Sequence, residues 1–273
     1  MSVYDINGNI VANLQTNDSL SDFKDIAYLK RLYLQSTGTV QGACTDGTYI
    51  YYGFSNLNSI IKYNILTKEV TTQSYDSGLL GHANDMTYNP NEKKIYVTVM
   101  DSAGTILAIN ADDLSDYSTF ALTDSSGNVI KTYGIAYDRE NNQYITADSG
   151  TDGKNYSFFD SSFNYVKTVT ITRNESMTIQ GIETDGEYLY RSLWDDTNNR
   201  NYIQVWTFGG TYLKQIELLD ATEVETIMND WNGNWYATFN TTGGGGKLYY
   251  LNFHKTAEFG TVEQLHKVLD AYA

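Results

Sequence analysis

The stretch Tyr133-Gly-Ile-Ala-Tyr-Asp138, with Tyr144-Ile-Thr-Ala-Asp148, Tyr156-Ser-Phe-Phe-Asp160 and Tyr165-Val-Lys-Thr-Val-Thr-Ile171 after it, decides the fold. All four segments are short apolar or aromatic runs, and residues rich in Gly, Asn, Asp and Ser separate them. Runs of this length between turn residues predict an antiparallel meander of four strands.

The same unit recurs along the chain, as in a propeller or solenoid. Its copies begin Gln41-Gly-Ala-Cys-Thr-Asp46, His82-Ala-Asn-Asp-Met-Thr87, Tyr133-Gly-Ile-Ala-Tyr-Asp138, Gln180-Gly-Ile-Glu-Thr-Asp185 and Glu225-Thr-Ile-Met-Asn-Asp230. A single blade would leave both faces uncovered, whereas radial packing buries them and leaves only short edges. Five copies therefore predict an all-β, five-bladed β-propeller over residues 29–273.

The fifth copy lacks a fourth strand after residues 247–253, so the last blade needs a strand from elsewhere. Residues 31–35 form a suitable apolar run just before the first copy. We therefore expect an N-terminal strand to close blade five.

The two ends of the chain are expected to lie outside the blades. Residues 1–28 are interpreted as a hairpin over residues 3–14 and a linker, although residues 16–28 also fit one face of a helix. Residues 261–272 carry apolar side chains at helical spacing and predict a short C-terminal helix.

The composition excludes several classes of function. A formal net charge of -15 repels nucleic-acid phosphates and anionic membranes. The sequence begins without a basic and apolar leader and holds no apolar run of membrane-spanning length, so we expect a virion or cytoplasmic protein. The one cysteine, Cys44, is expected to be a buried small residue, and most of the 24 tyrosines to be blade packing.

The first residue of each copy is the strongest sign of a site. These residues are Gln41, His82, Tyr133, Gln180 and Glu225. The first strand of a propeller blade lies along the axis, so the five side chains should form a ring at one mouth of the channel. All five can form hydrogen bonds, whereas a ring selected for packing alone would favour Val, Ile, Ala or Gly. Water held by a polar channel is the alternative explanation.

Other candidates lie around this ring. Asn84 and Asp85 follow His82 in the second copy, and Trp194 ends a strand beside a polar loop, where its ring can stack on a sugar. Glu225 with Asp85 or Glu183 can act as the acid and base of a glycoside hydrolase, or such carboxylates can hold Ca²⁺. No spacing motif selects either chemistry, so no cofactor is predicted.

The run Gly-Ile-Ala-Tyr-Asp138, with its later Asp148 and Asp160 segments, resembles the repeat of the NHL and streptogramin-lyase-like propellers over residues 40–253. This resemblance implies a ligand or catalytic site at the channel mouth. The histidine and acid arrangement of the lyases cannot be matched in this sequence, because only His82 is expected near the axis. The opening residues 3–11 and the richness in Asn, Thr, Tyr and Gly also resemble bacteriophage receptor-binding proteins.

The sequence therefore favours a propeller that binds a bacterial surface glycan, as a phage tail or related surface-recognition protein. In this hypothesis Gln41, His82, Gln180 and Glu225 donate and accept hydrogen bonds, while residues 3–14 contact other proteins of the assembly. A polysaccharide-degrading enzyme and a protein-interaction scaffold remain the alternatives.

Overall fold

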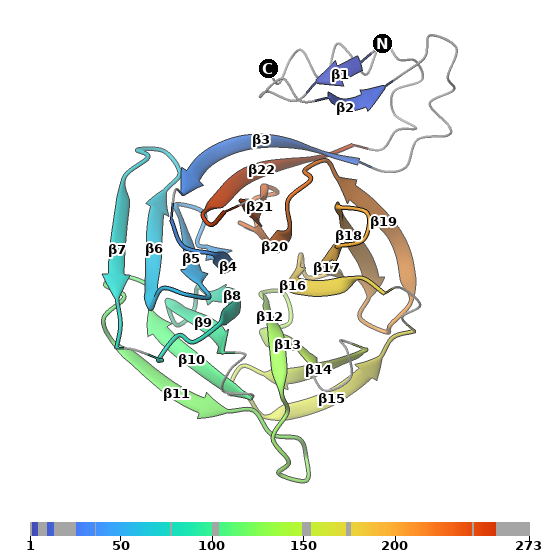
Figure 1. The fold of residues 1–273 in the computed structure, drawn as a ribbon. Helices are drawn as coiled ribbons and strands as arrows, with labels where there is room; N and C mark the ends of the chain where they lie inside the picture. Colours follow the sequence, from blue (N-terminus) through green and yellow to red (C-terminus); the bar gives the residue numbers. More distant parts are fainter. Residues whose placement is uncertain are drawn as a thin grey trace.

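The structure is a computed structural model that describes residues 2–4, 10–13, 26–35, 37–76, 78–99, 104–148, 154–172, 176–241 and 243–254. Figure 1 shows five blades arranged around a central axis, with the first strand of every blade innermost. The fold is the five-bladed, all-β propeller that the repeats predict, and no helix occurs in the described ranges.

Four blades are antiparallel meanders of four consecutive strands. Blade one holds β4 (Val40–Thr45), β5 (Tyr49–Phe54), β6 (Ser59–Asn64) and β7 (Val70–Ser74). Blade two holds β8 (Ala83–Asn89), β9 (Lys94–Val99), β10 (Thr105–Asn110) and β11 (Tyr117–Ala121). Blade three holds β12 (Thr132–Asp138), β13 (Gln143–Asp148), β14 (Asn155–Asp160) and β15 (Tyr165–Thr170). Blade four holds β16 (Thr178–Thr184), β17 (Tyr188–Asp195), β18 (Arg200–Thr207) and β19 (Tyr212–Leu218).

Blade five is closed by a strand from the other end of the chain, as expected. Its own strands are β20 (Val224–Asn229), β21 (Trp235–Asn240) and β22 (Gly246–His254), and β3 (Ile26–Gln35) pairs antiparallel with β22 along its length. The start of β3 also pairs in parallel with the end of β19, which joins blades four and five into one sheet (Figure 1). Residues 26–28 are therefore strand, and the helical alternative is wrong for them.

Before β3, β1 (Ser2–Tyr4) and β2 (Ile10–Asn13) pair antiparallel. The assignment of residues 1–28 as an extension outside the ring is wrong for residues 26–28, which belong to β3 of blade five, and stays a prediction for the rest. The C-terminal helix over residues 261–272 lies outside the described residues.

The hydrophobic core is divided among the interfaces between neighbouring blades. Each interface in the described part of the chain holds one cluster, such as that around Tyr137 and Tyr144 between blades two and three. Tyr51, Tyr52 and Tyr156 are likewise buried, as expected for blade packing. Cys44 is buried in the cluster between blades one and two, and burial raises the pKa of its thiol well above the ordinary value.

The acidic residue that ends each copy has a structural role in four blades. Asp46 Oδ1 accepts the backbone N–H groups of Thr48 and Tyr49, at 2.8 and 2.7 Å. Asp185 does the same in blade four, and Asp138 and Asp230 also accept bonds from their own turns. A carboxylate that caps its own turn fixes the hairpin between the first and second strands.

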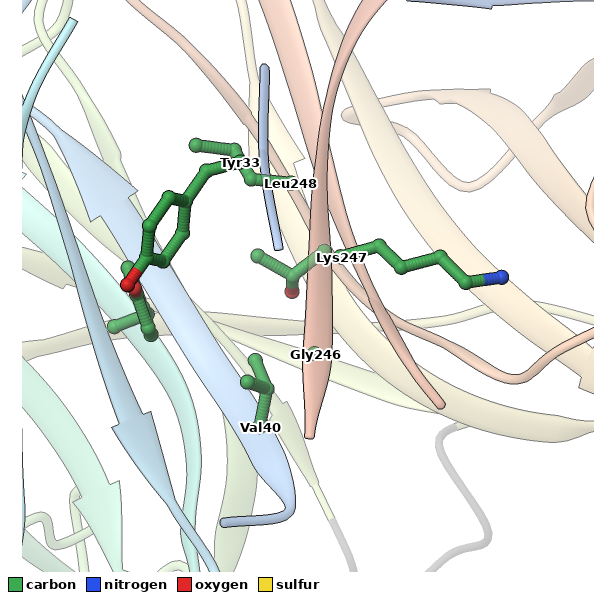
Figure 2. Close-up of a pocket in the computed structure, with 7 residues that line it drawn as sticks. Tyr33, Val40, Gly246, Lys247 and Leu248 are labelled. Atoms are coloured by element: carbon green, nitrogen blue, oxygen red, sulfur yellow. The ribbon is translucent and has the colours of Figure 1, made fainter. Parts of the chain in front are cut away.

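A small cavity lies at the seam where blade five meets blade one (Figure 2). Its lining residues are Tyr33, Val40, Tyr52, Thr238, Gly246, Lys247 and Leu248. The cavity has space for about one water molecule, which is far too little for a sugar.

Candidate functional site at the first mouth of the axis

The inner strand of every blade is irregular at the same place. We call the end of the axis where these strands begin the first mouth, and the end where they finish the second mouth. In blade three Thr132 pairs with Asp148 and Gly134 with Ala147, which leaves Tyr133 as the extra residue of a β-bulge. The residues at this position are Gln41, Asn84, Tyr133, Gln180 and Glu225. A bulge redirects a side chain, and bulges are frequent beside active sites.

Blade two differs from the prediction by two residues. The pairing of Ala83 with Val99 matches that of Thr132 with Asp148, so Asn84 occupies the ring position that was assigned to His82. The side chain of Asn84 donates to the carbonyl of Tyr133, at 2.8 Å, and to that of Gln180, at 3.1 Å. It thus links three blades at the first mouth.

His82 still belongs to this mouth, because it precedes β8 and contacts a ring residue. Its Nε2 is hydrogen-bonded to Oε1 of Gln41, and Gln41 Nε2 donates to the carbonyl of Val40. The ring predicted from sequence is therefore brought together, with Asn84 in it and His82 beside it.

Directly below the ring, Asp85 closes the axis. Its carboxylate has no exposed surface and accepts four hydrogen bonds. Oδ2 accepts the N–H groups of Ile135 and Ile182, both at 3.0 Å. Oδ1 accepts the N–H of Met86 at 3.0 Å and the hydroxyl of Thr226 at 2.8 Å. One side chain of blade two thereby binds to blades three, four and five.

Three blades have glycine where blade two has Asp85, and at Gly42 and Gly181 the atoms of Asp85 leave little room for a Cβ. A Cβ on Gly42 would lie 2.6 Å from the Cα of Asp85, and one on Gly181 would lie 3.0 Å from Asp85 Oδ1. Protein atoms thus fill the axis at this level and separate the two mouths. Burial raises the pKa of Asp85 to about 7, although its hydrogen bonds act in the opposite direction.

The first mouth also holds two neighbouring carboxyl groups. Glu225 is 2% exposed; burial, followed by the charge of Glu223, raises the pKa of Glu225 well above its ordinary value. Burial raises the pKa of Glu223 as well. Asn240 donates to Oε1 of Glu225, and Gln180 donates to Oε1 of Glu223 at 2.6 Å. Burial and the neighbouring negative charge therefore both favour the protonated form of Glu225.

The hydrolase hypothesis paired Glu225 with Asp85 or Glu183, and neither pairing suits a shared substrate. Asp85 is fully buried and occupied by four donors. Glu183 lies three residues further along the axis than the ring residue Gln180, which is roughly 10 Å towards the second mouth. The sequence did contain the better partner, since Glu223 precedes Glu225 by two residues, but no pattern distinguished it.

The loop that carries Glu223 is held from blade four. Asn201, which is fully buried in β18, donates to the carbonyls of Asp220 and Thr222, both at 2.7 Å. Its Oδ1 accepts the N–H of Val224, also at 2.7 Å. One amide therefore fixes the backbone on both sides of Glu223.

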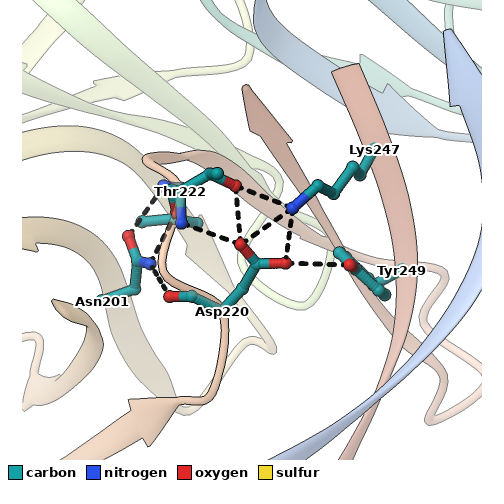
Figure 3. A network of polar contacts seen from close by, with 6 residues as sticks. Asn201, Asp220, Thr222, Lys247 and Tyr249 are labelled. Atoms are coloured by element: carbon teal, nitrogen blue, oxygen red, sulfur yellow. Dashed lines mark hydrogen bonds and ion pairs between the residues drawn. The ribbon is translucent and has the colours of Figure 1, made fainter. Parts of the chain in front are cut away.

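An ion pair in blade five holds the same loop (Figure 3). Lys247 Nζ lies 2.9 Å from Oδ2 of Asp220 and 3.0 Å from the hydroxyl of Thr222. Tyr249 donates to the same carboxylate at 2.8 Å. Burial alone would raise the pKa of Asp220, but the bonds from Thr222 and Lys247 outweigh it and lower that pKa.

Trp194 lies at the end of β17, on the strand face that looks towards these carboxyl groups. Side chains two residues apart share a face, and Ser192 Oγ on that face donates to the carbonyl of Glu225 at 3.4 Å. Trp194 is half-buried. Its role as a platform for a sugar stays a prediction.

No group of three or more His, Cys, Asp or Glu side chains in the described residues is placed to hold a metal ion, and the calcium alternative stays a prediction. No helix long and apolar enough to cross a membrane occurs in the described residues.

The chain is similar in structure to other proteins with a TM-score above 0.5. A glutaminyl cyclase of Myxococcus xanthus is 12% identical with a TM-score of 0.58, covering 84% of this chain and 97% of that one. A PQQ-bound aldose sugar dehydrogenase of Streptomyces coelicolor is 10% identical with a TM-score of 0.53, covering 84% and 98%. The Swd1 β-propeller domain of Myceliophteria thermophila is 9% identical with a TM-score of 0.51, covering 82% and 100%.

No protein-family profile and no curated protein matches the sequence. At identities of 9 to 12%, the structural likeness establishes the fold alone. The β-propeller fold is thereby confirmed, and the finer resemblance to the NHL and streptogramin-lyase-like propellers stays a prediction.

Proposed function

We propose that the first mouth binds a carbohydrate of a bacterial surface. The observation that carries the proposal is the bulge shared by all five blades, which directs five polar side chains to one place. Amide groups both donate and accept hydrogen bonds, as sugar hydroxyls do. Trp194, half-buried at the end of β17, would supply an aromatic face for the C–H surface of a sugar ring, whereas Tyr133 packs in the cluster between blades three and four.

The charge state of the mouth favours a neutral ligand. Burial and the charge of Glu223 raise the pKa of Glu225 and so favour its protonated form, which is a hydrogen-bond donor. The net charge of -15 disfavours strongly anionic ligands at any mouth of this protein. A neutral polysaccharide should accordingly bind better than a teichoic acid.

Within this proposal the chain belongs to a phage tail or a related surface-recognition assembly. The antiparallel pair β1 and β2 precedes the ring and would dock to neighbouring proteins. Removal of residues 1–15 should leave a folded ring that binds glycan and no longer assembles. Loss of folding would show instead that the segment belongs to the core.

The binding test uses fluorescently labelled cell-wall polysaccharides, neutral and anionic, with binding and chain length followed in the same samples. Gln180→Ala removes an amide of the mouth, and Gln73→Ala removes one from the outer strand of blade one as the control. Loss of one hydrogen bond to the sugar should weaken binding about tenfold in the first variant only. Equal binding by both variants would contradict a site at the first mouth, and no binding across the panel would favour the scaffold function.

A second function is favoured by one specific observation, the coupled pair Glu223 and Glu225. A carboxyl group with a raised pKa beside another carboxyl group is the arrangement of a general acid and its partner. Glu225→Gln separates the two functions in the same assay. Binding without shortening in the wild type supports the binding protein, whereas shortening that this variant abolishes, with binding retained, supports a glycoside hydrolase.

A further inference from the structure

The second mouth contains an arginine held in an unusual way. Arg139 follows Asp138, the last residue of β12, and Trp231 follows the matching residue Asp230 after β20, so the two residues occupy matching positions of blades three and five. The guanidinium carbon of Arg139 lies 5.2 Å from the centroid of the Trp231 ring. The two side chains therefore meet over the end of blade four.

The turn of blade four leaves room for this contact. Gly186, at a φ of +91°, occupies the matching position there. A Cβ on Gly186 would lie 3.3 Å from Trp231 Cζ3 and 2.5 Å from Glu140 Cγ. Trp231 thus packs against the backbone of Gly186, and its ring forms a cation–π contact with the guanidinium of Arg139.

Arg139 lacks an acceptor in the described part of the chain. Its Nε is buried with no hydrogen-bond partner there, and no described carboxylate forms an ion pair with it. The nearby acids are engaged elsewhere: Asp138 Oδ2 accepts from Asn141 at 2.7 Å, and Asp230 Oδ2 accepts from Asn234 at 2.7 Å. Burying the N–H group of Arg139 Nε without an acceptor costs free energy of folding. A ligand that accepts a hydrogen bond from the guanidinium would offset this cost on binding.

The neighbouring groups define the ligand further. Glu183 is 6% exposed, and its oxygens accept the N–H groups of Thr184 and Asn229. Burial raises the pKa of Glu183 to about 8, which disfavours its negative charge and weakens its interaction with the charge of Arg139. Tyr88, half-buried on the adjacent inner strand, lies close enough for the charge of Arg139 to act on its phenol.

We propose that the second mouth is a separate binding site, in which Arg139 and Trp231 receive the carboxylate of a small aromatic acid. A guanidinium offers two parallel N–H donors that match a carboxylate, and the contact with Trp231 holds this group at the second mouth. The aromatic rings of Trp231 and Tyr88 suit contact with the flat apolar ring of such an acid. The turn carboxylates around the mouth disfavour a dianion such as phosphate.

This site is independent of the glycan site, because the level of Asp85 separates the two mouths. Changes at Arg139 should therefore leave glycan binding unaltered. Each site can be present or absent without the other.

Titration of the full chain with benzoate, followed by tryptophan fluorescence at constant ionic strength, tests the proposal. Benzamide has the same shape without the charge and serves as the ligand control. We expect benzoate to bind at least tenfold more tightly than benzamide, and Arg139→Gln to abolish that preference. Arg200→Gln alters an exposed arginine of blade four and should leave it unchanged.

A second measurement avoids dependence on a variant. Phenylglyoxal modification of the wild type, mapped by mass spectrometry, should show benzoate protecting Arg139 and not Arg200. Equal affinities for benzoate and benzamide, absence of benzoate binding, or protection of neither residue would each overturn the proposal.

Discussion

Asp85→Asn tests whether a buried carboxylate on the axis makes the ring less stable as pH rises. The pKa of Asp85 increases from its ordinary value of 3.8 to about 7 on folding. Between these values the folded protein keeps a proton that the unfolded chain has released, so stability falls with rising pH. The difference corresponds to about 4 kcal/mol, and about 3 kcal/mol of it falls between about pH 5 and pH 8.

The asparagine variant removes this titration at a limited structural cost. Its oxygen can keep the N–H groups of Ile135 and Ile182, and the hydroxyl of Thr226 can rotate to accept from the new amide. Only the N–H of Met86 then lacks an acceptor, which costs about 1 to 3 kcal/mol at any pH. At acidic pH the variant should therefore have a smaller free energy of unfolding than the wild type. Between about pH 5 and pH 8 the wild type should lose about 3 kcal/mol that the variant keeps, so the difference should shift by that amount in favour of the variant.

Urea unfolding followed by tryptophan fluorescence measures this difference. The titrations are made at about pH 5, 6.5 and 8 in about 0.5 M salt, which screens surface repulsion but not a buried charge. Asp113→Asn is the control, because Asp113 is exposed and bonds from the Ser115 segment lower its pKa. A free-energy difference between the wild type and Asp85→Asn that does not change with pH would refute the reasoning.

Three further changes should act on the same framework, each measured by urea unfolding. Gly42→Ala places a Cβ 2.6 Å from the backbone of Asp85 and should cost about 1 to 3 kcal/mol, whereas Gly209→Ala, with its nearest neighbour at 3.7 Å, should cost less than about 1 kcal/mol. Asn201→Ala removes three hydrogen bonds from the loop around Glu223 and should cost about 3 kcal/mol, with weaker glycan binding. Lys247→Met leaves the 9%-exposed carboxylate of Asp220 without its cation and should cost about 3 kcal/mol; a loss near zero would show that water replaces the ion pair.

The fold could be predicted from sequence because its signals are local. Strand alternation, turn residues and an acid that caps its own turn all lie within a few residues of one another, as Asp46 and Asp185 do. Repetition then gave the number of blades, and the missing fourth strand of blade five indicated that β3 would close it. Most of the predicted ring residues meet at the first mouth for the same reason.

The register of blade two could not be predicted, because a bulge is recognised by pairing and not by spacing. His82 and Asn84 both have polar side chains, and only the pairing of Ala83 with Val99 places Asn84 in the ring. The same pairing places Asp85 where other blades have glycine, and its role exists only when blades three to five surround it.

The sequence by itself therefore determined the propeller, its five blades, the strand that closes it and the polar character of one mouth. The tertiary structure alone decided which carboxyl groups have raised pKa values, since those of Glu223 and Glu225 depend on burial and on donors from other strands. It also decided that Arg139 meets Trp231, which follows it by about two blades in the chain. Contacts of this kind arise from packing between distant segments, and no local pattern encodes them.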